Sequence, residues 1–340
     1  MCALGLATCS VAAAVAQDNG IQTLHAYSNL VQVPTLVLDL DRKPIPPIAE
    51  RRFFVSLDAG PRFQVTHARP EGEDPISLAI LLDLSQPSPN LMTWIDDAVA
   101  GMAPAALHAS DHVSIYALDC DLVRVGGYVP ANSATLKRSV DLALESWNAR
   151  GRDRRKRACR SPWNLWDSLM SMTVAMGEQP GRRVILAATD GLDRGSKSTW
   201  NEVRVLAQQR AVAIFGMLQF GDTLPVFRNG SSYDENLFNG VCELTGGMVL
   251  TATDKTLAER LTRFVSLLRG RYIVEFPRPM STVGGYHDMK ITIQKADLFI
   301  RPSGIKVPTV DPTILNDPST VKSDPTNAPQ LGNRKVIEPK

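Results

Sequence analysis

Between residues 76 and 270 the chain alternates short apolar runs with amphipathic segments, and this alternation constrains the fold more than any other feature. The runs ISLAILLDLS (76–85) and RRVILAATDG (182–191) are continuously apolar at their centres, as in parallel strands buried on both faces. The segment ATLKRSVDLALESWNA (134–149) instead repeats Leu and Val every three or four positions, which is typical of a helix with one buried side. The alternation predicts an α/β fold with a doubly wound, mostly parallel sheet, because strands joined through helices follow right-handed crossovers.

The remaining elements of this region follow from the same two periodicities. The adjacent runs 112–120 and 122–129 are predicted to be a pair of strands. In the helix predicted at 161–178, Ser161 suits the N-cap and Pro162 suits the first helical position. Helices are predicted at 90–107, 134–149, 161–178, 196–211, 233–247 and 254–270.

Two β-rich segments flank this domain, which is predicted to span residues 73–270. Residues 17–72 contain strand-like alternation around a Pro-rich stretch, and short strands return at 271–306. We expect both segments to pack together as an accessory, sandwich-like β unit. Residues 307–340 are rich in Pro, Asp, Ser and Asn and poor in aromatic residues, and they are predicted to form a disordered tail.

Residues 1–16 carry no charge and end in Ala14-Val15-Ala16, which resembles the apolar region and cleavage site of a secretory signal peptide. A basic region is missing before them, and the alternative is an apolar N-terminal helix of the fold. A signal peptide predicts an exported protein that is secreted, periplasmic or held at the cell surface. No later run has the ~18 uninterrupted apolar residues of a membrane-spanning helix, so none is expected.

Cleavage after Ala16 would leave three cysteines, and an odd number in an exported protein allows one disulfide and one thiol. We prefer the pair Cys120–Cys159, because both residues are expected near the same end of the sheet. The alternative is three separate buried thiols, including Cys242.

Acidic and hydroxyl side chains follow two of the predicted central strands. Asp83 and Ser85 end the run at 76–85, and Thr189, Asp190 and Asp193 end the run at 182–191 or follow it. Ligands of open α/β sheets bind at the carboxyl ends of strands, so we expect these side chains to meet in one crevice. Their hard oxygen atoms are suitable ligands for Mg²⁺.

The D-x-S after the first central strand and the T-D-G-x-D-x-x-S after the fourth resemble the motifs of a von Willebrand factor type A domain. With β segments on both sides, the layout is similar to that of the bacterial exported "VWFA-related" proteins over roughly residues 29–305. The resemblance implies a domain that binds protein ligands, often through a metal-ion-dependent adhesion site.

Against the pattern of that adhesion site, this chain is incomplete. Pro87 stands at the second serine and Trp163 at the threonine, and neither supplies a side-chain oxygen. Ser88 and Ser161 are the nearest substitutes. The resemblance therefore implies a degenerate site that holds Mg²⁺ weakly through waters, and the alternative is a structural hydrogen-bond cluster. Three residues match the pattern: Asp83, Ser85 and Asp190.

The run ARGRDRRKRACR (149–160) is strongly basic and is predicted to be a loop beside the same crevice. Because arginine favours forked contacts to carboxylate or phosphate, the loop is a candidate rim that steers an acidic partner, and the alternative is a solvated surface. The loop lacks interleaved aromatic residues and the net charge is only +2, so nucleic acid is not an expected partner. The candidate rim comprises Arg154, Arg155, Lys156, Arg157, Trp163 and Asp193.

The sequence therefore favours an exported, non-enzymatic module that binds a protein or an acidic cell-surface ligand, with Mg²⁺ as its candidate cofactor. A structural scaffold or assembly protein without a metal is the alternative. A metal-assisted hydrolase is less favoured, because no nucleophile–base pair in the sequence supports it.

Overall fold

The structure is a computed structural model that describes residues 30–85, 92, 94–152, 163–219, 232–279, 285–303, 305–307 and 327–334. The predicted signal peptide at 1–16 and the basic residues 153–160 lie outside the described residues.

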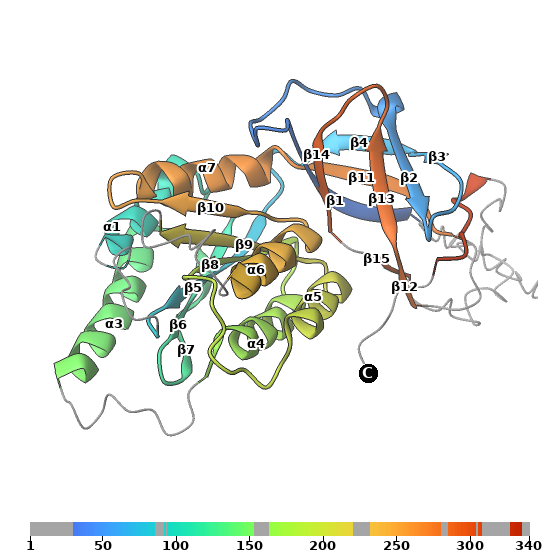
Figure 1. The fold of residues 1–340 in the computed structure, drawn as a ribbon. Helices are drawn as coiled ribbons and strands as arrows, with labels where there is room; N and C mark the ends of the chain where they lie inside the picture. Colours follow the sequence, from blue (N-terminus) through green and yellow to red (C-terminus); the bar gives the residue numbers. More distant parts are fainter. Residues whose placement is uncertain are drawn as a thin grey trace, which may run out of the picture. The chain divides into compact units, whose positions relative to one another are not determined.

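The described chain contains a six-stranded sheet in the order β10-β9-β8-β5-β6-β7 (Figure 1). Neighbouring strands from β10 to β6 are parallel, and β7 is antiparallel to β6. This arrangement confirms both the mostly parallel sheet and the predicted pair of strands at 112–129. The strands are β5 (Ile76–Asp83), β6 (His112–Leu118), β7 (Leu122–Pro130), β8 (Arg182–Ala188), β9 (Val212–Gln219) and β10 (Val249–Ala252).

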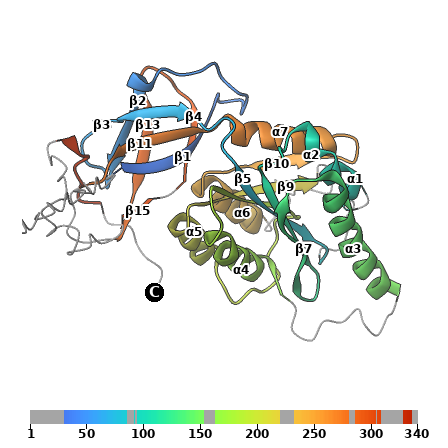
Figure 2. The same ribbon diagram turned by 180° about the vertical axis from the view of Figure 1, so that it is seen from behind.

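Helices cover both faces of this sheet (Figures 1 and 2). Alternate residues of β5 point to opposite faces, so Leu78 and Ile80 join the core beneath α1, α3 and α7, while Ala79 and Leu81 join the core beneath α4, α5 and α6. The doubly wound fold is thereby confirmed. The helices are α1 (Ile95–Ala100), α2 (Met102–Ala105), α3 (Ser133–Arg152), α4 (Leu165–Gly177), α5 (Trp200–Gln209), α6 (Ser232–Leu244) and α7 (Leu257–Arg269).

Two of the predicted helices differ from those observed. The single helix predicted at 90–107 is wrong, because Ala103 has extended backbone angles and Pro104 has no N–H with which to continue a helix. The helix predicted at 161–178 begins at Leu165 with Asn164 at the N-cap, so the predicted cap, Ser161, is wrong as well. The first turn of α4 obtains hydrogen-bond partners from the loop after β8, as described below.

Strands from both ends of the chain form the accessory β unit, as predicted. One sheet has the order β14-β1-β11-β4, a second has the order β13-β2-β3, and β12 pairs with β15. The first two sheets share a core to which β1 contributes Val33, β2 contributes Phe53 and β11 contributes Phe276. The strands are β1 (Leu30–Leu38), β2 (Phe53–Leu57), β3 (Phe63–Gln64), β4 (His67–Pro70), β11 (Tyr272–Pro277), β12 (Gly285–His287), β13 (Met289–Ile293), β14 (Phe299–Pro302) and β15 (Ile305–Val307), with a 3₁₀ helix at Glu50–Arg52.

The prediction of a disordered tail at 307–340 is wrong for residues 327–334. Leu331 bridges Leu57 at the end of β2, and the Gly332 N–H donates to the Leu57 carbonyl at 3.1 Å. Ala328 is buried, and Leu331 packs against the core of the β unit. The segment is polar on average, but Ala328 and Leu331 supply apolar side chains and the backbone at Leu57 supplies a hydrogen-bond acceptor, so this part of the segment packs.

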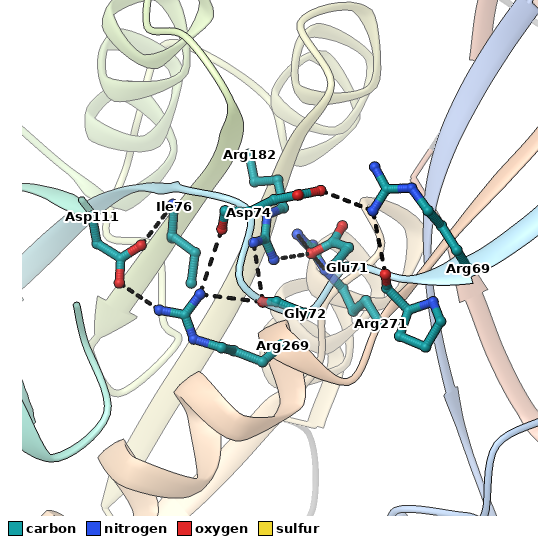
Figure 3. Close-up of polar contacts among 10 residues, drawn as sticks. Arg69, Glu71, Gly72, Asp74, Ile76, Asp111, Arg182, Arg269 and Arg271 are labelled. Carbon is teal, nitrogen blue, oxygen red and sulfur yellow. Dashed lines mark hydrogen bonds and ion pairs between the residues drawn. The ribbon is translucent and has the colours of Figure 1, made fainter. Parts of the chain in front are cut away.

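The chain passes twice between the sheet domain and the β unit, once from β4 to β5 and once from α7 to β11. Glu71 in the first passage is fully buried, and its Oε2 accepts from Arg182 Nη1 at 2.8 Å and from Arg271 Nη2 at 3.1 Å (Figure 3). Arg271 belongs to the second passage and Arg182 is the first residue of β8. One carboxylate therefore links both passages to the central sheet, and we call these three residues the Glu71 cluster.

A second ion pair reinforces the same junction (Figure 3). Arg269, the last residue of α7, donates to Asp111 Oδ2 at 2.6 Å and to the carbonyl of Gly72 at 3.3 Å. Asp111 also accepts from the Ile76 N–H at 2.9 Å, where β5 begins. The end of α7, the start of β5 and the first passage are thus bonded to one another.

Replacement of Glu71 by Gln should destabilise the protein strongly. The substitution leaves two buried guanidinium groups without their counter-charge, which costs about 3–5 kcal/mol in the free energy of unfolding. Denaturant titration measures this change. Glu73→Gln is the matched control, because the Glu73 side chain is 76% exposed and, among the described residues, forms its ion pair with His108. A Glu71→Gln protein about as stable as the control would show that the cluster does not stabilise the junction.

Candidate functional site

The ends of β5 and β8 meet, as the sequence predicted for the two acid-bearing turns. The strands pair in parallel up to Leu82 and Ala188, so the next residues emerge at the same edge. The Thr189 hydroxyl donates to Asp83 Oδ2 at 2.6 Å. Asp83, Ser85, Thr189 and Asp190 therefore belong to one location at the carboxyl end of the sheet.

Asp83 is a buried structural group rather than an open ligand. Only 1% of the residue is exposed, and its Oδ1 accepts from the Ser85 N–H at 3.1 Å and from the Ser85 hydroxyl at 2.6 Å. Burial raises the pKa of Asp83 and the charge of Asp190 adds to this effect, while the hydrogen bonds from Ser85 and Thr189 oppose it. The carboxylate thus ties the two strand ends together.

Asp190 is paired with an arginine that the sequence analysis did not identify. Arg194 bonds both carboxylate oxygens, with Nη1 donating to Oδ1 at 3.3 Å and Nη2 paired with Oδ2. The hydrogen bond to Asp190 raises the pKa of Arg194, and the charges of Asp83 and Asp193 contribute in the same direction. The guanidinium therefore provides a positive charge among the three carboxylates at this end of the sheet, those of Asp83, Asp190 and Asp193.

Asp193, which we predicted at the ligand-binding rim, holds its own loop to α4. Its Oδ1 accepts from the Trp166 N–H at 3.2 Å and from the Ser196 hydroxyl at 2.6 Å. Its Oδ2 accepts from the N–H groups of Gly195 and Ser196 at 3.1 and 2.9 Å. These bonds satisfy a first-turn donor of α4 that would otherwise lack a partner.

Asp167 completes this connection from the helix side. Its carboxylate accepts from the N–H groups of Lys197 and Ser198 at 3.0 and 2.8 Å, and its own backbone N–H donates to the Ser196 hydroxyl oxygen at 3.1 Å. Burial raises the pKa of Asp167, but the backbone hydrogen bonds outweigh it and the net pKa is lowered. The loop after β8 and the start of α4 are therefore one hydrogen-bonded unit.

In this arrangement the candidate Mg²⁺ ligands among the described residues are engaged with groups of the protein. No group of three His, Cys, Asp or Glu side chains in the described ranges is placed to hold a metal ion. The oxygens of the predicted ligands Asp83, Ser85 and Asp190 are bonded within the chain, and Arg194 already supplies a cation. The predicted helpers Ser88 and Ser161 lie outside the described residues, as does Pro87.

The other predicted rim residues are only partly covered by the structure. Trp163 is 38% exposed, so its indole is accessible at the start of this region. Its backbone N–H donates to the Cys120 carbonyl at 3.0 Å. The basic residues Arg154, Arg155, Lys156 and Arg157 lie outside the described residues.

Thr189 and Arg194 complete this group of side chains. The sequence placed Thr189 among them, but its bond to Asp83 depends on the strand register and was not predicted. Arg194 lies four residues after Asp190, a spacing that brings opposite charges together in a helix but predicts little in a loop.

No family model and no curated protein matches the chain. A solved structure of proximal thread matrix protein 1 from the mussel byssus is 13% identical, covering 62% of this chain and 49% of that chain, with a TM-score of 0.40. The pilus adhesin SpaC from Lactobacillus rhamnosus GG is 8% identical, covering 67% of this chain and 36% of that chain, with a TM-score of 0.41. The vWF domain of the type V pili tip protein Mfa5 from Porphyromonas gingivalis is 11% identical, covering 57% of this chain and 94% of that chain, with a TM-score of 0.37.

The likeness to these neighbours, one of which is a vWF domain by its description, concerns the fold alone. The chain spans about half the length of the byssus protein that it matches. Its own strand order, layers and added antiparallel sheets confirm the von Willebrand factor A-like fold that the sequence resemblance implied. Among the described helices, none combines the length and the apolar character of a membrane-crossing segment.

The Asp83→Asn variant should gain stability relative to the wild type as pH rises. Because burial raises the folded-state pKa of Asp83, the folded state binds its proton more tightly than the unfolded state. This contribution to stability is present at low pH and is lost as pH rises through the raised pKa. Denaturant titrations of both proteins at several pH values, from acidic to slightly alkaline, should show a difference that grows with pH. A constant or shrinking difference would contradict the assignment.

The two described cysteines should respond differently to a thiol reagent. Cys242 is buried and its thiol is unpaired, and burial strongly raises its pKa, so alkylation in the native state should leave it unmodified until the protein unfolds. Cys120 is disulfide-bonded to a residue outside the described ranges. Mass spectrometry of a non-reduced digest should recover Cys120 linked to Cys159, the pairing predicted from the sequence. A link from Cys120 to Cys2 or Cys9 would contradict this prediction.

Proposed function

We propose that this chain is an exported, non-enzymatic protein-binding module whose recognition surface is the carboxyl-end crevice, and that it binds without Mg²⁺. The observation that carries the proposal is the pairing of Arg194 with both oxygens of Asp190. In an adhesion site of this fold, as the resemblance implies, a divalent cation offsets the charge of the carboxylates. Here a fixed guanidinium serves that purpose.

The residues of this region differ in exposure: some are buried and support the structure, and others are exposed and can contact a partner. Asp83 and Thr189 are buried, whereas the side chains of Asp190 and Arg194 are 27% and 33% exposed. Trp163 adds a half-exposed aromatic surface of the type that anchors protein interfaces. The groups that can contact a partner are therefore the Asp190–Arg194 ion pair and the Trp163 indole.

The partner class follows from the run of basic residues that directly precedes Trp163 in the chain. Seven Arg and Lys residues between 150 and 160, with a single acid, would attract an acidic protein surface from a distance. We propose an acidic protein or cell-surface polymer as the ligand. Export rests on the apolar segment at 1–16 and its A-x-A ending.

A structural scaffold without a ligand is the second candidate, and the buried Asp83–Ser85–Thr189 hydrogen bonds favour it. Those bonds stabilise the strand ends whether or not a partner binds. The two candidates differ at Arg194, which a scaffold needs only for stability and a binding module needs for affinity. The hydrolase alternative would require an unengaged carboxylate base, and the described oxygens of Asp83, Asp190 and Asp193 all accept hydrogen bonds.

The first test is the response of melting temperature to Mg²⁺. The wild type should melt at the same temperature in millimolar Mg²⁺ as in EDTA, whereas Arg194→Gln should melt higher in Mg²⁺, because an uncompensated carboxylate then attracts the cation. Arg138→Gln, an exposed position on α3, is the control for the loss of one positive charge. A wild-type protein that is itself stabilised by Mg²⁺ would support the metal-dependent site instead.

The second test addresses binding. Immobilised wild type should retain the same surface-labelled proteins of the source cells in EDTA as in Mg²⁺, and Arg194→Gln and Trp163→Ala should lose them while Arg138→Gln keeps them. A partner retained equally by all variants binds elsewhere. If no partner distinguishes the correctly folded variants, the scaffold candidate is favoured.

A further inference from the structure

A second charged site lies at the other end of the same sheet, where β8 and β9 begin, and it does not depend on the proposed function. A cavity of about 380 Å³ opens there between these strands, the first passage and β1 and β11. Its volume is in the range of small-molecule sites, which often lie where two packed units meet. The charged residues of its wall are Arg69, Asp74, Arg182, Arg183 and Arg271.

The arginines of this cavity outnumber the carboxylates that neutralise them. Glu71 serves both Arg182 and Arg271, and Asp74 pairs with Arg69 at 3.0 Å. The four arginines that line the cavity are therefore matched by two carboxylates, Asp74 in its wall and Glu71 next to it, which leaves an excess of two positive charges. In a partly desolvated cavity such an excess is unfavourable until an anion enters.

Arg183 accounts for one of the uncompensated charges. Its Nε donates to the Gln179 carbonyl at 2.7 Å and its Nη1 donates to the Arg210 carbonyl at 2.8 Å. No described carboxylate pairs with it. Two carbonyl oxygens thus hold the side chain in place without neutralising it, and Nη2 remains available as a donor.

Arg182 supplies a second, independent indication. Only 7% of the residue is exposed, it lines the cavity, and its Nε has no hydrogen-bond partner in the described part of the chain. Buried donors are normally satisfied, so this one can take a further acceptor from the cavity, although the neighbouring Glu71 Oε1 is itself without a described donor. Figure 3 shows Arg182 and Arg271 turned toward Glu71 from opposite sides, with Arg69 beside them on the strand that leads into the first passage.

We propose that this cavity binds a small oxyanion with two negative charges, such as the phosphate group of an organic monoester. The double charge matches the excess of two, and guanidinium forks suit the oxygens of phosphate. Ile273, Ala211 and Ala213 form an apolar part of the wall that can accept the organic portion. Such a ligand contacts residues of both passages, so its binding would also stabilise the junction between the sheet domain and the β unit.

The test is a titration of the full chain with inorganic phosphate and with glycerol phosphate, compared with sodium chloride at equal ionic strength. Both phosphates should raise the melting temperature by several degrees, in proportion to occupancy. A larger effect of glycerol phosphate would assign the site to an organic monoester, and equal effects would assign it to phosphate itself. Equal melting in phosphate and in chloride would overturn the proposal, with the cavity then holding only water.

Arg183→Gln should weaken phosphate binding in calorimetry about tenfold or more, since it removes a charged donor of the wall. Arg69→Gln, at a rim position with a 51% exposed side chain, provides a second variant should the first fail to fold. Arg138→Gln on α3 removes the same charge far from the cavity and should bind phosphate normally. Unchanged affinity in a folded Arg183→Gln or Arg69→Gln protein would also overturn the proposal. None of these outcomes depends on whether the crevice at Asp190 binds a partner.

Discussion

The buried carboxylate of Glu71 is the interaction on which the arrangement of the described chain depends. Two arginines, one from the start of β8 and one from the start of β11, are buried against it and would be uncompensated without it. A charge buried without a partner costs several kcal/mol, so the two passages of the chain cannot separate from the sheet independently. Arg269 and Asp111 extend the same constraint to the end of α7 and the start of β5. The β unit is therefore an integral part of the fold.

The pairing of β5 with β8, which begins next to the Glu71 cluster, also determines how Asp83 and Thr189 lie at the other end of these strands. β5 and β8 pair without interruption from Ile76 and Arg182 to Leu82 and Ala188, and a shift by one residue would reverse which side chains are buried. This register places Thr189 within 2.6 Å of Asp83. Because the sheet is rigid between its two ends, the position of Arg182 and the position of the crevice are set by the same pairing.

Most of the fold was predictable from the sequence, because apolar periodicity records which residues are buried. The parallel strands, the antiparallel pair and the β-rich flanks all followed from it. The break at Ala103, the start of α4 at Leu165 and the packing of 327–334 did not, since each depends on contacts with residues distant in sequence. The start of α4 is the clearest case: a carboxylate 27 residues later, Asp193, accepts the Trp166 N–H.

The candidate site was less predictable than the fold, for a related reason. A motif identifies residue types at the ends of strands, and it correctly located Asp83, Ser85 and Asp190 in one region. It does not show which oxygens are already bonded. The roles of Asp83, Asp193 and Arg194 are set by burial and by hydrogen bonds that only three-dimensional proximity creates. The Glu71 cluster left no signal at all, because Arg182 and Arg271 follow Glu71 by 111 and 200 positions and so form no local pattern with it.

The missing metal-ligand oxygens and the presence of Arg194 both concern how the negative charge of the carboxylates is compensated. Pro87 and Trp163 stand where the resemblance implies hydroxyl ligands, so a divalent cation would have fewer protein oxygens to replace its waters. The carboxylates would still repel one another, as the effect of Asp190 on the pKa of Asp83 shows. A guanidinium relieves that repulsion with directional N–H bonds and needs no hydroxyl ligands. It also carries one charge where Mg²⁺ carries two, so Asp83, Asp190 and Asp193 together keep a residual negative character.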